Sequence, residues 1–384
     1  MPSRNSTRVV AVFVFALLLS VAASLHAVEV RITTWNLNWF PNGKPKEEPP
    51  AEQERRIHAA ADVLRAINPD VILLQEVRDY ETAQKLADTI KPAAYQIAIC
   101  SAFKDSFQTG LGKQQVVIMA KEPAQAAWAE PWKSMQGVDP PRGFAFAWFK
   151  INGVEVGIYC VHLKSNLIMR GDKAAEGAKN IRKREVASEQ LLDHIQTVVA
   201  SKMPTVRSFI IGGDFNTNAD EFADEATLTR LEQNGFQSCM EGLSRTLRVT
   251  HPGGHGYPDT TFDYLFAKGA TIDKPMITRS EASDHLPVTC NVTLSATGVV
   301  ANNATAAQSP AVATNGAPEP ATPSAVETES TVTLTQPVTI KIAYGETTLP
   351  AGTKLPVVSR DGQTVLVRYM GQVYPLPLSR TDLH

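Results

Sequence analysis

The stretch Ile210-Ile211-Gly212-Gly213-Asp214-Phe215-Asn216 joins an apolar run to two polar side chains. The apolar run predicts a buried strand that stops at the two glycines. Residues two apart leave a strand on one face, so Asp214 and Asn216 can converge on one small target beyond the strand's end. A turn in which both side chains bond to the local backbone is the structural alternative.

The size and composition of the chain indicate a mainly globular protein. Its 384 residues are enough for one large core and a small module. Hydrophobic residues make up 43% of the chain and charged residues 20%. The net charge of -2 does not indicate a strongly basic nucleic-acid-binding protein. We interpret the local basic cluster Arg182-Lys183-Arg184 as a solvated helix face.

The first 27 residues resemble an export signal. A positive start precedes an apolar run from Val9 to Val21, and small residues follow it. The run is short for a membrane span, so we predict a signal peptide over 1–27, cleaved near Ala27, with an uncleaved anchor as the alternative. The protein is then periplasmic or extracellular, where disulfides are permitted. The four cysteines form no CxxC pair, so a zinc site is not indicated.

Residue patterns across 28–295 predict one domain of interleaved strands and helices. Apolar residues recur at helical spacing in 52–67, and Asn68-Pro69 should end that helix. Further helices are expected over 81–90 and 178–200, and strands over 28–36, 71–74, 95–101, 115–120, 144–150, 154–161, 209–211, 261–266 and 287–294. Because several strand pairs are hairpins, an α+β domain of two face-to-face sheets with helices outside fits better than a doubly wound sheet.

The composition changes after this domain. Residues 296–330 are rich in Ala, Thr and Pro and predict a flexible linker. Short alternating runs return over 331–384, between Gly and Pro turns, and predict a small β-barrel that resembles bacterial SH3-like domains. Such a module is expected to bind a cell-wall or protein surface.

Six predicted strands end or begin at polar side chains. Each of these residues alone has an ordinary structural explanation, such as a turn residue or a buried core histidine. Their shared position instead indicates one common face. They are Asn36, Glu76, His162, Asp214 with Asn216, Asp263, and Asp284 with His285.

These side chains fit metal-assisted hydrolysis of a phosphate ester. Oxygen donors without cysteine suit Mg²⁺, or Mn²⁺, rather than zinc. His285 can activate water as a general base while Asp263 fixes its tautomer. His162 and Lys164 leave one strand two residues apart, so both can contact phosphate oxygens as charge develops.

Six motifs in order resemble those of the endonuclease/exonuclease/phosphatase superfamily. The likeness covers residues 28–294 and implies a four-layer α/β sandwich with its site at one end. The motifs are Thr34-Trp35-Asn36-Leu37-Asn38, Leu74-Gln75-Glu76-Val77, Val161-His162-Leu163-Lys164-Ser165, Gly213-Asp214-Phe215-Asn216, Phe262-Asp263-Tyr264-Leu265-Phe266 and Ser283-Asp284-His285-Leu286-Pro287-Val288.

The resemblance also implies roles for individual residues. Asn36 and Glu76 would hold the divalent metal, and Asp284 would serve the metal or the phosphate. Asp214 would orient or activate the attacking water. The other implied roles are a phosphate contact for Asn216, an acid–base pair of Asp263 and His285, transition-state stabilisation or leaving-group protonation for His162, and a phosphate contact for Arg142.

We therefore expect an exported, monomeric, metal-dependent phosphodiesterase that acts on DNA or RNA. One alternative keeps this chemistry and changes the substrate to a lipid or sugar phosphate, which suits the mild negative charge. The other alternative is a non-catalytic surface-binding protein delivered by its C-terminal module.

Overall fold

The computed structural model describes most of the chain between residues 27 and 383. The predicted linker over 296–330 and the predicted signal peptide, apart from Ala27, lie outside the described residues. None of the described helices is long and apolar enough to cross a membrane. The described ranges are 27–105, 107–168, 170–222, 224–254, 257–294, 331–342, 345–349, 351–369 and 372–383.

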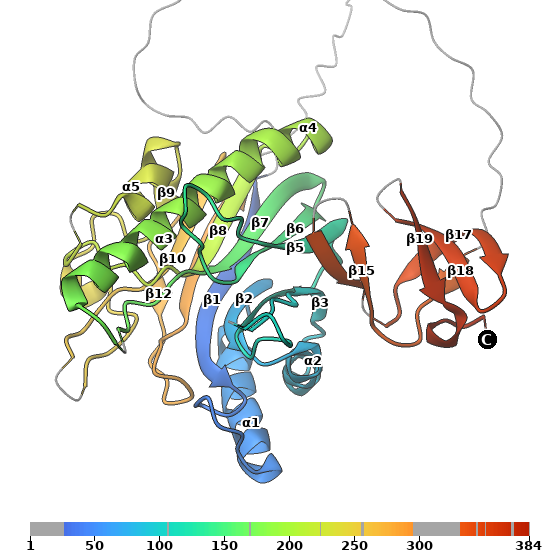
Figure 1. Cartoon of the computed structure of the whole chain (residues 1–384), viewed down its shortest axis with the longest axis horizontal. Helices are drawn as coiled ribbons and strands as arrows, with labels where there is room; N and C mark the ends of the chain where they lie inside the picture. The colour runs from blue at the N-terminus through green and yellow to red at the C-terminus, as the bar shows by residue number, and fades with distance from the viewer. Residues whose placement is uncertain are drawn as a thin grey trace, which may run out of the picture.

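The first of two mixed β-sheets lies at the centre of the molecule (Figure 1). Its described strands follow the order β11-β13-β1-β2-β4-β3, and β12 pairs with β13. β1 and β2 are parallel, and the other neighbours are antiparallel. The strands are β1 (Val28–Phe40), β2 (Val71–Val77), β3 (Gln96–Cys100), β4 (Gln115–Ala120), β11 (Ala270–Ile272), β12 (Met276–Ile277) and β13 (Val288–Leu294).

The second sheet packs face to face against the first. Its order is β15-β16-β5-β6-β7-β8-β10-β9, and β7 and β8 are its parallel pair. The strands are β5 (Ala126–Pro131), β6 (Gly143–Ile151), β7 (Val154–His162), β8 (Ser208–Asp214), β9 (Gln237–Ser238), β10 (Asp263–Lys268), β15 (Val338–Ile342) and β16 (Gly345–Leu349). The expected α+β architecture of two packed sheets is confirmed.

Helices cover the outer faces of both sheets (Figure 1). α1 and α2 pack on the first sheet, in a cluster that includes Leu64, Leu86 and Leu74. α3 and α5 pack on the second sheet within the main core. The helices are α1 (Pro50–Ile67), α2 (Tyr80–Thr89), α3 (Lys173–Asp193), a π-helical turn (His194–Val199), α4 (Ala200–Lys202), α5 (Ala226–Gln233) and 3₁₀ turns at Arg245–Leu247 and Leu378–Arg380.

The sequence pattern of α1 explains both its buried face and its end. The apolar residues predicted to face inward, including Ile57, Ala61 and Leu64, are all buried. Asn68 then adopts a left-handed conformation with φ 52°, and its N–H bonds to the Leu64 carbonyl at 2.8 Å. Asn tolerates this conformation better than most residues, so it ends the helix.

Gly212 and Gly213 do not stop β8, which is a correction to the sequence interpretation. The strand continues through both glycines to Asp214. A Cβ on Gly212 would lie 2.5 Å from Leu73 Cδ1, and one on Gly213 would lie 1.9 Å from the Val161 carbonyl oxygen. Gly213 has no room for a side chain beside the β7 backbone, and at Gly212 the side chain of Leu73 from the first sheet occupies the space that a Cβ would need.

The C-terminal segment does not form the expected closed SH3-like barrel among its described residues. Four of its strands make a separate sheet in the order β14-β17-β18-β19, and the β15–β16 hairpin instead extends the second sheet. The four strands are β14 (Thr331–Thr333), β17 (Lys354–Asp361), β18 (Thr364–Tyr369) and β19 (Gln372–Pro377).

The hairpin covers the edge strand β5. Thr347 Oγ1, on β16, donates a hydrogen bond to the Ala127 carbonyl. Tyr369 Oη, on β18, accepts one from the Ala127 N–H at 3.4 Å. Leu349 is buried in the same core cluster as the β5 side chain of Trp128. An uncovered strand edge is prone to pair with other chains, so this contact also protects β5.

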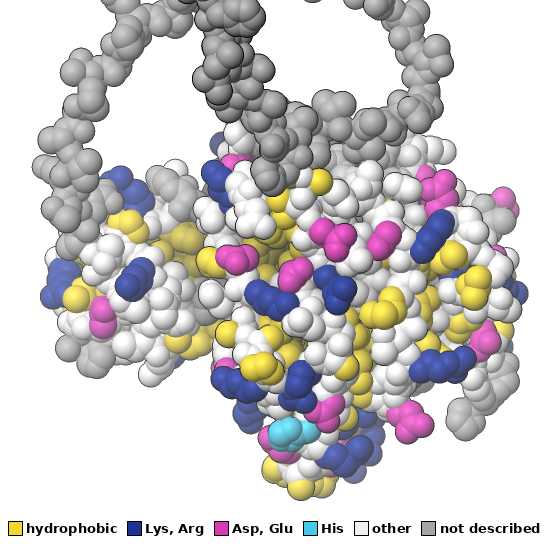
Figure 2. Space-filling view, turned by 180° about the vertical axis from the view of Figure 1, so that it is seen from behind, with side chains coloured by type: hydrophobic (Ala, Val, Ile, Leu, Met, Phe, Trp, Pro, Cys, Tyr) yellow, Lys and Arg dark blue, Asp and Glu magenta, His cyan; other side chains and the backbone are white. Residues whose placement is uncertain are grey.

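Charged side chains of both signs are interspersed on the face drawn in Figure 2. This distribution agrees with the net charge of -2. No broad basic surface is visible on the part of this face that belongs to the described chain.

Replacing Leu349 with alanine is expected to lower the free energy of unfolding by about 2–5 kcal/mol, because the side chain is only 4% exposed. Amide hydrogen exchange should also speed up along β5. Val373, which is 46% exposed on β19, is the matched control, and Val373→Ala should change neither quantity appreciably. Equal effects of the two substitutions would contradict the docking of β16 on β5.

Candidate active site

Three of the predicted site residues lie side by side in neighbouring strands. Asp214 at the end of β8 is in register with His162 at the end of β7 and with Asp263 at the start of β10. In the facing sheet, β1 and β2 end at the same side of the sandwich, where Asn36 is in register with Gln75. The strand ends therefore bring the predicted side chains together.

Asp214 is the central side chain of this group. Its Oδ2 accepts a hydrogen bond from Asn36 Nδ2 at 2.9 Å, and its Oδ1 accepts one from the Asn216 N–H at 2.8 Å. Burial raises the pKa of Asp214 to about 7, with a further contribution from Asp263, although His285 and Asn36 act in the opposite direction. The bond to Asn216 is the local turn that the sequence left open as an alternative, and it coexists with the contacts to the site.

Glu76 reaches the same place from β2 through an unusual backbone conformation. Its φ of 61° lies in the left-handed region, which costs free energy for a residue with a side chain. Its Oε2 accepts a hydrogen bond from the Trp39 N–H at 2.8 Å. Its Oε1 lies 3.4 Å from Asn36 Nδ2, so Glu76 and Asp214 share one amide neighbour.

His285 and Asp263 form a buried pair. His285 Nδ1 lies 2.8 Å from Asp263 Oδ2, and the His285 carbonyl accepts a hydrogen bond from Trp35 Nε1 at 2.9 Å. Burial alone would lower the pKa of His285, but Asp263, with smaller contributions from Asp214 and Asp284, raises it to about 10. The ring is thus oriented with Nε2 toward Asp214, at 3.9 Å from its Oδ2.

His162 faces the two carboxylates with its other ring nitrogen unpaired. Its Nε2 lies 3.6 Å from Asp214 Oδ2 and 3.7 Å from Glu76 Oε1. Burial, together with the nearby positive charge of Arg142, holds the pKa of His162 well below its usual value, so the ring is neutral. Its Nδ1 has no hydrogen-bond partner among the described residues. These contacts favour a proton on Nε2, directed toward the site.

The donor set fits a hard divalent cation. Glu76 and Asp214 place two carboxyl groups around the same amide and imidazole groups. Ligand atoms of Asp214, Asp263 and His285 also lie within 4.8 Å of one another. We favour the Glu76 side, because Asp263 and His285 already satisfy each other.

Two of the predicted metal ligands, Asn36 and Asp284, do not direct an oxygen atom at the two carboxyl groups. Asn36 directs its nitrogen at the carboxylates, because its Oδ1 accepts a hydrogen bond from the Asn38 N–H at 2.9 Å. A metal-binding Asn36 would need its amide turned over. Asp284 is exposed, and its Oδ1 lies 3.3 Å from Ser283 Oγ. The metal-binding roles of both residues stay predictions.

The structure surrounds Arg142 with protein acceptors. Its guanidinium group donates to the carbonyls of His162 and Leu163, at 3.0 and 2.7 Å, and to Gln114 Oε1 at 3.1 Å. These bonds fix the backbone that follows β7. A phosphate contact by Arg142 is therefore still a prediction, but a role in shaping the site is visible directly.

Lys164 and Asn216 lie on the two loops that leave β7 and β8. The Lys164 ammonium group is half-buried and donates to the Ser165 carbonyl at 2.9 Å. Asn216 has φ 53°, and its Nδ2 donates to the Leu163 carbonyl at 3.2 Å. Both are near the buried group, and their predicted phosphate contacts remain untested.

Sequence reasoning missed His251 and Thr250. The His251 ring packs edge-on against His285, with 4.8 Å between ring centroids. Thr250 Oγ1 accepts hydrogen bonds from the N–H groups of Phe262 and Asp263, at 3.0 and 3.1 Å, and so anchors the start of β10. Both residues lie in an irregular loop, where neither a helical or strand repeat of apolar residues nor a sequence motif identifies them.

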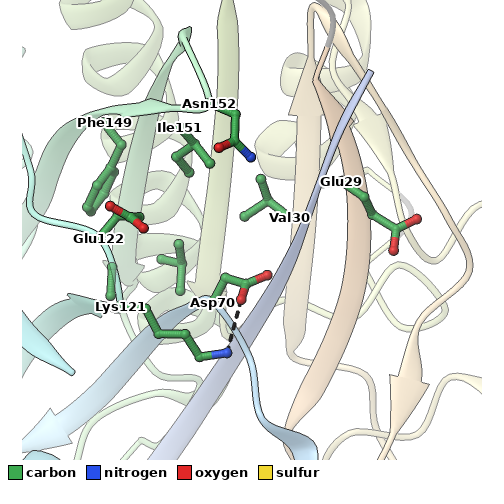
Figure 3. A pocket seen from close by; sticks show the side chains of 10 residues that line it. Glu29, Val30, Asp70, Lys121, Glu122, Phe149, Ile151 and Asn152 are labelled. Carbon is green, nitrogen blue, oxygen red and sulfur yellow. Dashed lines mark hydrogen bonds and ion pairs between the residues drawn. The ribbon is translucent and has the colours of Figure 1, made fainter. Parts of the chain in front are cut away.

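A separate pocket of about 200 Å³ lies at the opposite end of the sandwich (Figure 3). It is lined by residues at the starts of β1 and β2 and the end of β4, and Lys121 pairs there with Asp70 at 3.0 Å. Glu122 also lines it, but neither histidine of the buried group does. This pocket is therefore distinct from the candidate active site.

Two packed mixed sheets with a buried Asp–His pair at one end place the protein in the α/β-sandwich class. The family model described as "Endonuclease/Exonuclease/phosphatase family" matches residues 33–285. The chain belongs to this family, whose members are phosphoric ester hydrolases. The resemblance seen in the six motifs is thereby confirmed.

Solved structures show the same fold at low sequence identity. An endonuclease/exonuclease/phosphatase from Beutenbergia cavernae DSM 12333 is 16% identical, with a TM-score of 0.51 over 69% of this chain and 72% of that one. TDP2 from C. elegans is 18% identical, with a TM-score of 0.49 over 70% and 76%. A comparison with curated proteins gave no match. The likeness to the Beutenbergia cavernae structure supports the fold alone.

Replacing Asp263 with asparagine is expected to lower the pKa of His285 from about 10 to below the usual value of about 6.5. The carboxylate that favours the charged ring is lost, whereas burial, which disfavours it, remains. Titration of the ring by NMR would measure the change. Asp284→Asn, which removes a neighbouring but exposed carboxylate, should shift the pKa far less. An unchanged titration in Asp263→Asn would contradict the assigned pairing.

Proposed function

We propose that this protein is an exported, divalent-metal-dependent phosphodiesterase that cleaves DNA or RNA by attack of water. The observation that supports it most is the row His162, Asp214 and Asp263, with His285 bonded to Asp263 at 2.8 Å. Hydrolysis needs a group that orients the water, a group that accepts its proton and a group that stabilises the negative charge developing on the phosphate in the transition state. The row offers all three.

Each side chain has a distinct task in this proposal. Asp214 holds the attacking water, and His285 Nε2, on the same side at 3.9 Å from Asp214 Oδ2, accepts its proton. Asp263 fixes the ring so that Nε2 faces the water. His162, neutral and with Nε2 directed at the site, donates a hydrogen bond to a phosphate oxygen.

The protonation of His285 connects this mechanism to a cation. With a pKa near 10, His285 is protonated at neutral pH and holds no free lone pair at Nε2. A nearby positive charge opposes protonation. A divalent cation bound by Glu76 and Asp214 would neutralise their charge, polarise the phosphate and favour the neutral ring. We propose Mg²⁺ for this site, with Mn²⁺ as a substitute, because the donors are oxygen atoms.

The loops at the site end support nucleic acid as the substrate. Phe107, between β3 and β4, is 82% exposed, and Tyr257, between β9 and β10, is 73% exposed. Both connections lie at the end of the sandwich where β4 and β10 begin. Exposed aromatic rings can stack on unpaired bases of any sequence.

Exposed aliphatic side chains motivate the second candidate, a lipid or sugar phosphate. Leu167, in the loop that follows β7, and Leu247, between β9 and β10, are 62% and 66% exposed. Exposed aliphatic side chains on a chain with a net charge of -2 suit a lipid substrate better than a nucleic-acid duplex. A substrate panel separates the candidates: release of phosphocholine or inorganic phosphate, with nucleic acid uncut, would favour this second one.

His285→Ala is expected to lower kcat on plasmid DNA with Mg²⁺ by roughly 10²- to 10⁴-fold, because the proton acceptor is lost. His58, an exposed histidine on α1, provides the control, and His58→Ala should cut like the wild type. Gel electrophoresis of timed samples gives the rates. Cleavage by His285→Ala at the wild-type rate would reject the mechanism.

Glu76→Gln is expected to weaken Mn²⁺ binding by at least about 10-fold, because one of two convergent carboxylates loses its charge. Calorimetric titration of the metal-free protein would measure the affinity without any turnover. Glu122→Gln, in the pocket at the opposite end, is the matched control and should bind normally. Equal affinity in Glu76→Gln and the wild type would place the cation elsewhere.

A further inference from the structure

Arg184 is fully buried, so the interpretation of the basic cluster as a solvated helix face is wrong for this residue. It lies on α3 and forms a two-bond ion pair with Glu225 at the start of α5. Nε donates to Oε1 at 2.7 Å, and Nη2 donates to Oε2 at 2.5 Å. Thr227 Oγ1 donates a third bond to Glu225 Oε1 at 2.6 Å.

The third guanidinium nitrogen of Arg184, Nη1, bonds to the loop that follows β7. Arg184 Nη1 donates to the Lys164 carbonyl at 3.0 Å and to Asn166 Oδ1 at 2.7 Å. Asn166 Nδ2 then donates to the Asn216 carbonyl at 2.7 Å. A continuous chain of hydrogen bonds thus joins the buried ion pair to the loop that follows β8.

This chain ends at the candidate active site. Asn216 has φ 53°, a conformation that its surroundings must hold in place. Its N–H donates to Asp214 Oδ1 at 2.8 Å, so a shift of Asn216 would also move a contact of the central carboxylate. Lys164, on the other loop, is fixed at its backbone by the same guanidinium group.

We propose that Arg184, Glu225 and Asn166 are positioning residues that hold Lys164 and Asn216 in their catalytic geometry. The inference rests on the function proposed above. None of the three touches the row of reacting groups; they act through the two loops. The ion pair fixes the direction of the guanidinium group, and Asn166 transmits that direction to Asn216.

Stability alone does not account for this arrangement. A buried ion pair gains little over well-packed apolar side chains, because removing both charges from water offsets their attraction. Nη1, by contrast, meets two acceptors on the site loop that an apolar side chain cannot bond. The loop contacts are therefore the property that this pair supplies.

The first test is Asn166→Ala, which removes the link and leaves the ion pair intact. We expect kcat on bis(p-nitrophenyl) phosphate with Mg²⁺ to fall about 10- to 100-fold, with KM and the thermal midpoint little changed. Asn234 also donates a side-chain bond to a backbone carbonyl, that of Arg230 at 2.9 Å, but lies at the C-terminal end of α5, the opposite end of that helix from Glu225. Asn234→Ala should therefore keep the wild-type kcat.

The second test is the double variant Arg184→Met with Glu225→Leu, which replaces the ion pair with apolar side chains of similar length. We expect the same loss of kcat as in Asn166→Ala, without the loss of folding that one unpaired buried charge would cause. A wild-type kcat in Asn166→Ala, or an equal fall in Asn234→Ala, would overturn the positioning role.

The two proposals fail in different ways. If the wild-type protein cleaves neither plasmid DNA nor bis(p-nitrophenyl) phosphate with Mg²⁺ or Mn²⁺, the proposed phosphodiesterase function is wrong and the positioning role fails with it. If the wild type is active and Asn166→Ala is equally active, only the positioning role is wrong.

Discussion

The hydrogen bond from Asn36 to Asp214 crosses between the two sheets at the end that carries the site. It can form only because β1 and β8 approach each other closely there. Gly212 permits that approach, since a Cβ at this position would collide with Leu73 of the first sheet. The site thus depends on the absence of a side chain at Gly212 as much as on the presence of its polar ones.

Burial gives these groups unusual charge states. In water an aspartic acid is ionised at neutral pH and a histidine is largely neutral. In the site the pKa of Asp214 rises to about 7 and that of His285 to about 10, whereas that of His162 falls. The two histidines differ because His285 has the Asp263 carboxylate as a partner, and His162 has none in bonding contact. One residue type thereby provides two protonation states within one small volume.

Much of the fold was predictable because its signals are local. The apolar period of α1 and the strand runs at 115–120 and 154–161 depend only on neighbouring residues. The polar side chains at the strand ends were predictable too, since each follows or precedes an apolar run in the sequence. These signals predicted most of the elements and several of the residues that meet at the site, but not the contacts between distant segments.

The remaining features depend on contacts that no local pattern encodes. Two glycines after an apolar run look alike whether they turn the chain or let another sheet approach, so the end of β8 was misplaced. The strand β5 and the helix α5 were also missed. Arg184 looked exposed because it follows two other basic residues, and its partner Glu225 is 41 positions away.

The C-terminal hairpin has a consequence for how the chain is made. β5 is synthesised early, but the strand that covers its edge ends only at Leu349. Protein domains generally begin to fold from the N-terminus during synthesis. The edge of β5 therefore stays uncovered until β16 has been synthesised, a period in which neighbouring nascent copies can pair with it. Pairing of β16 with β5 ends this period of exposure.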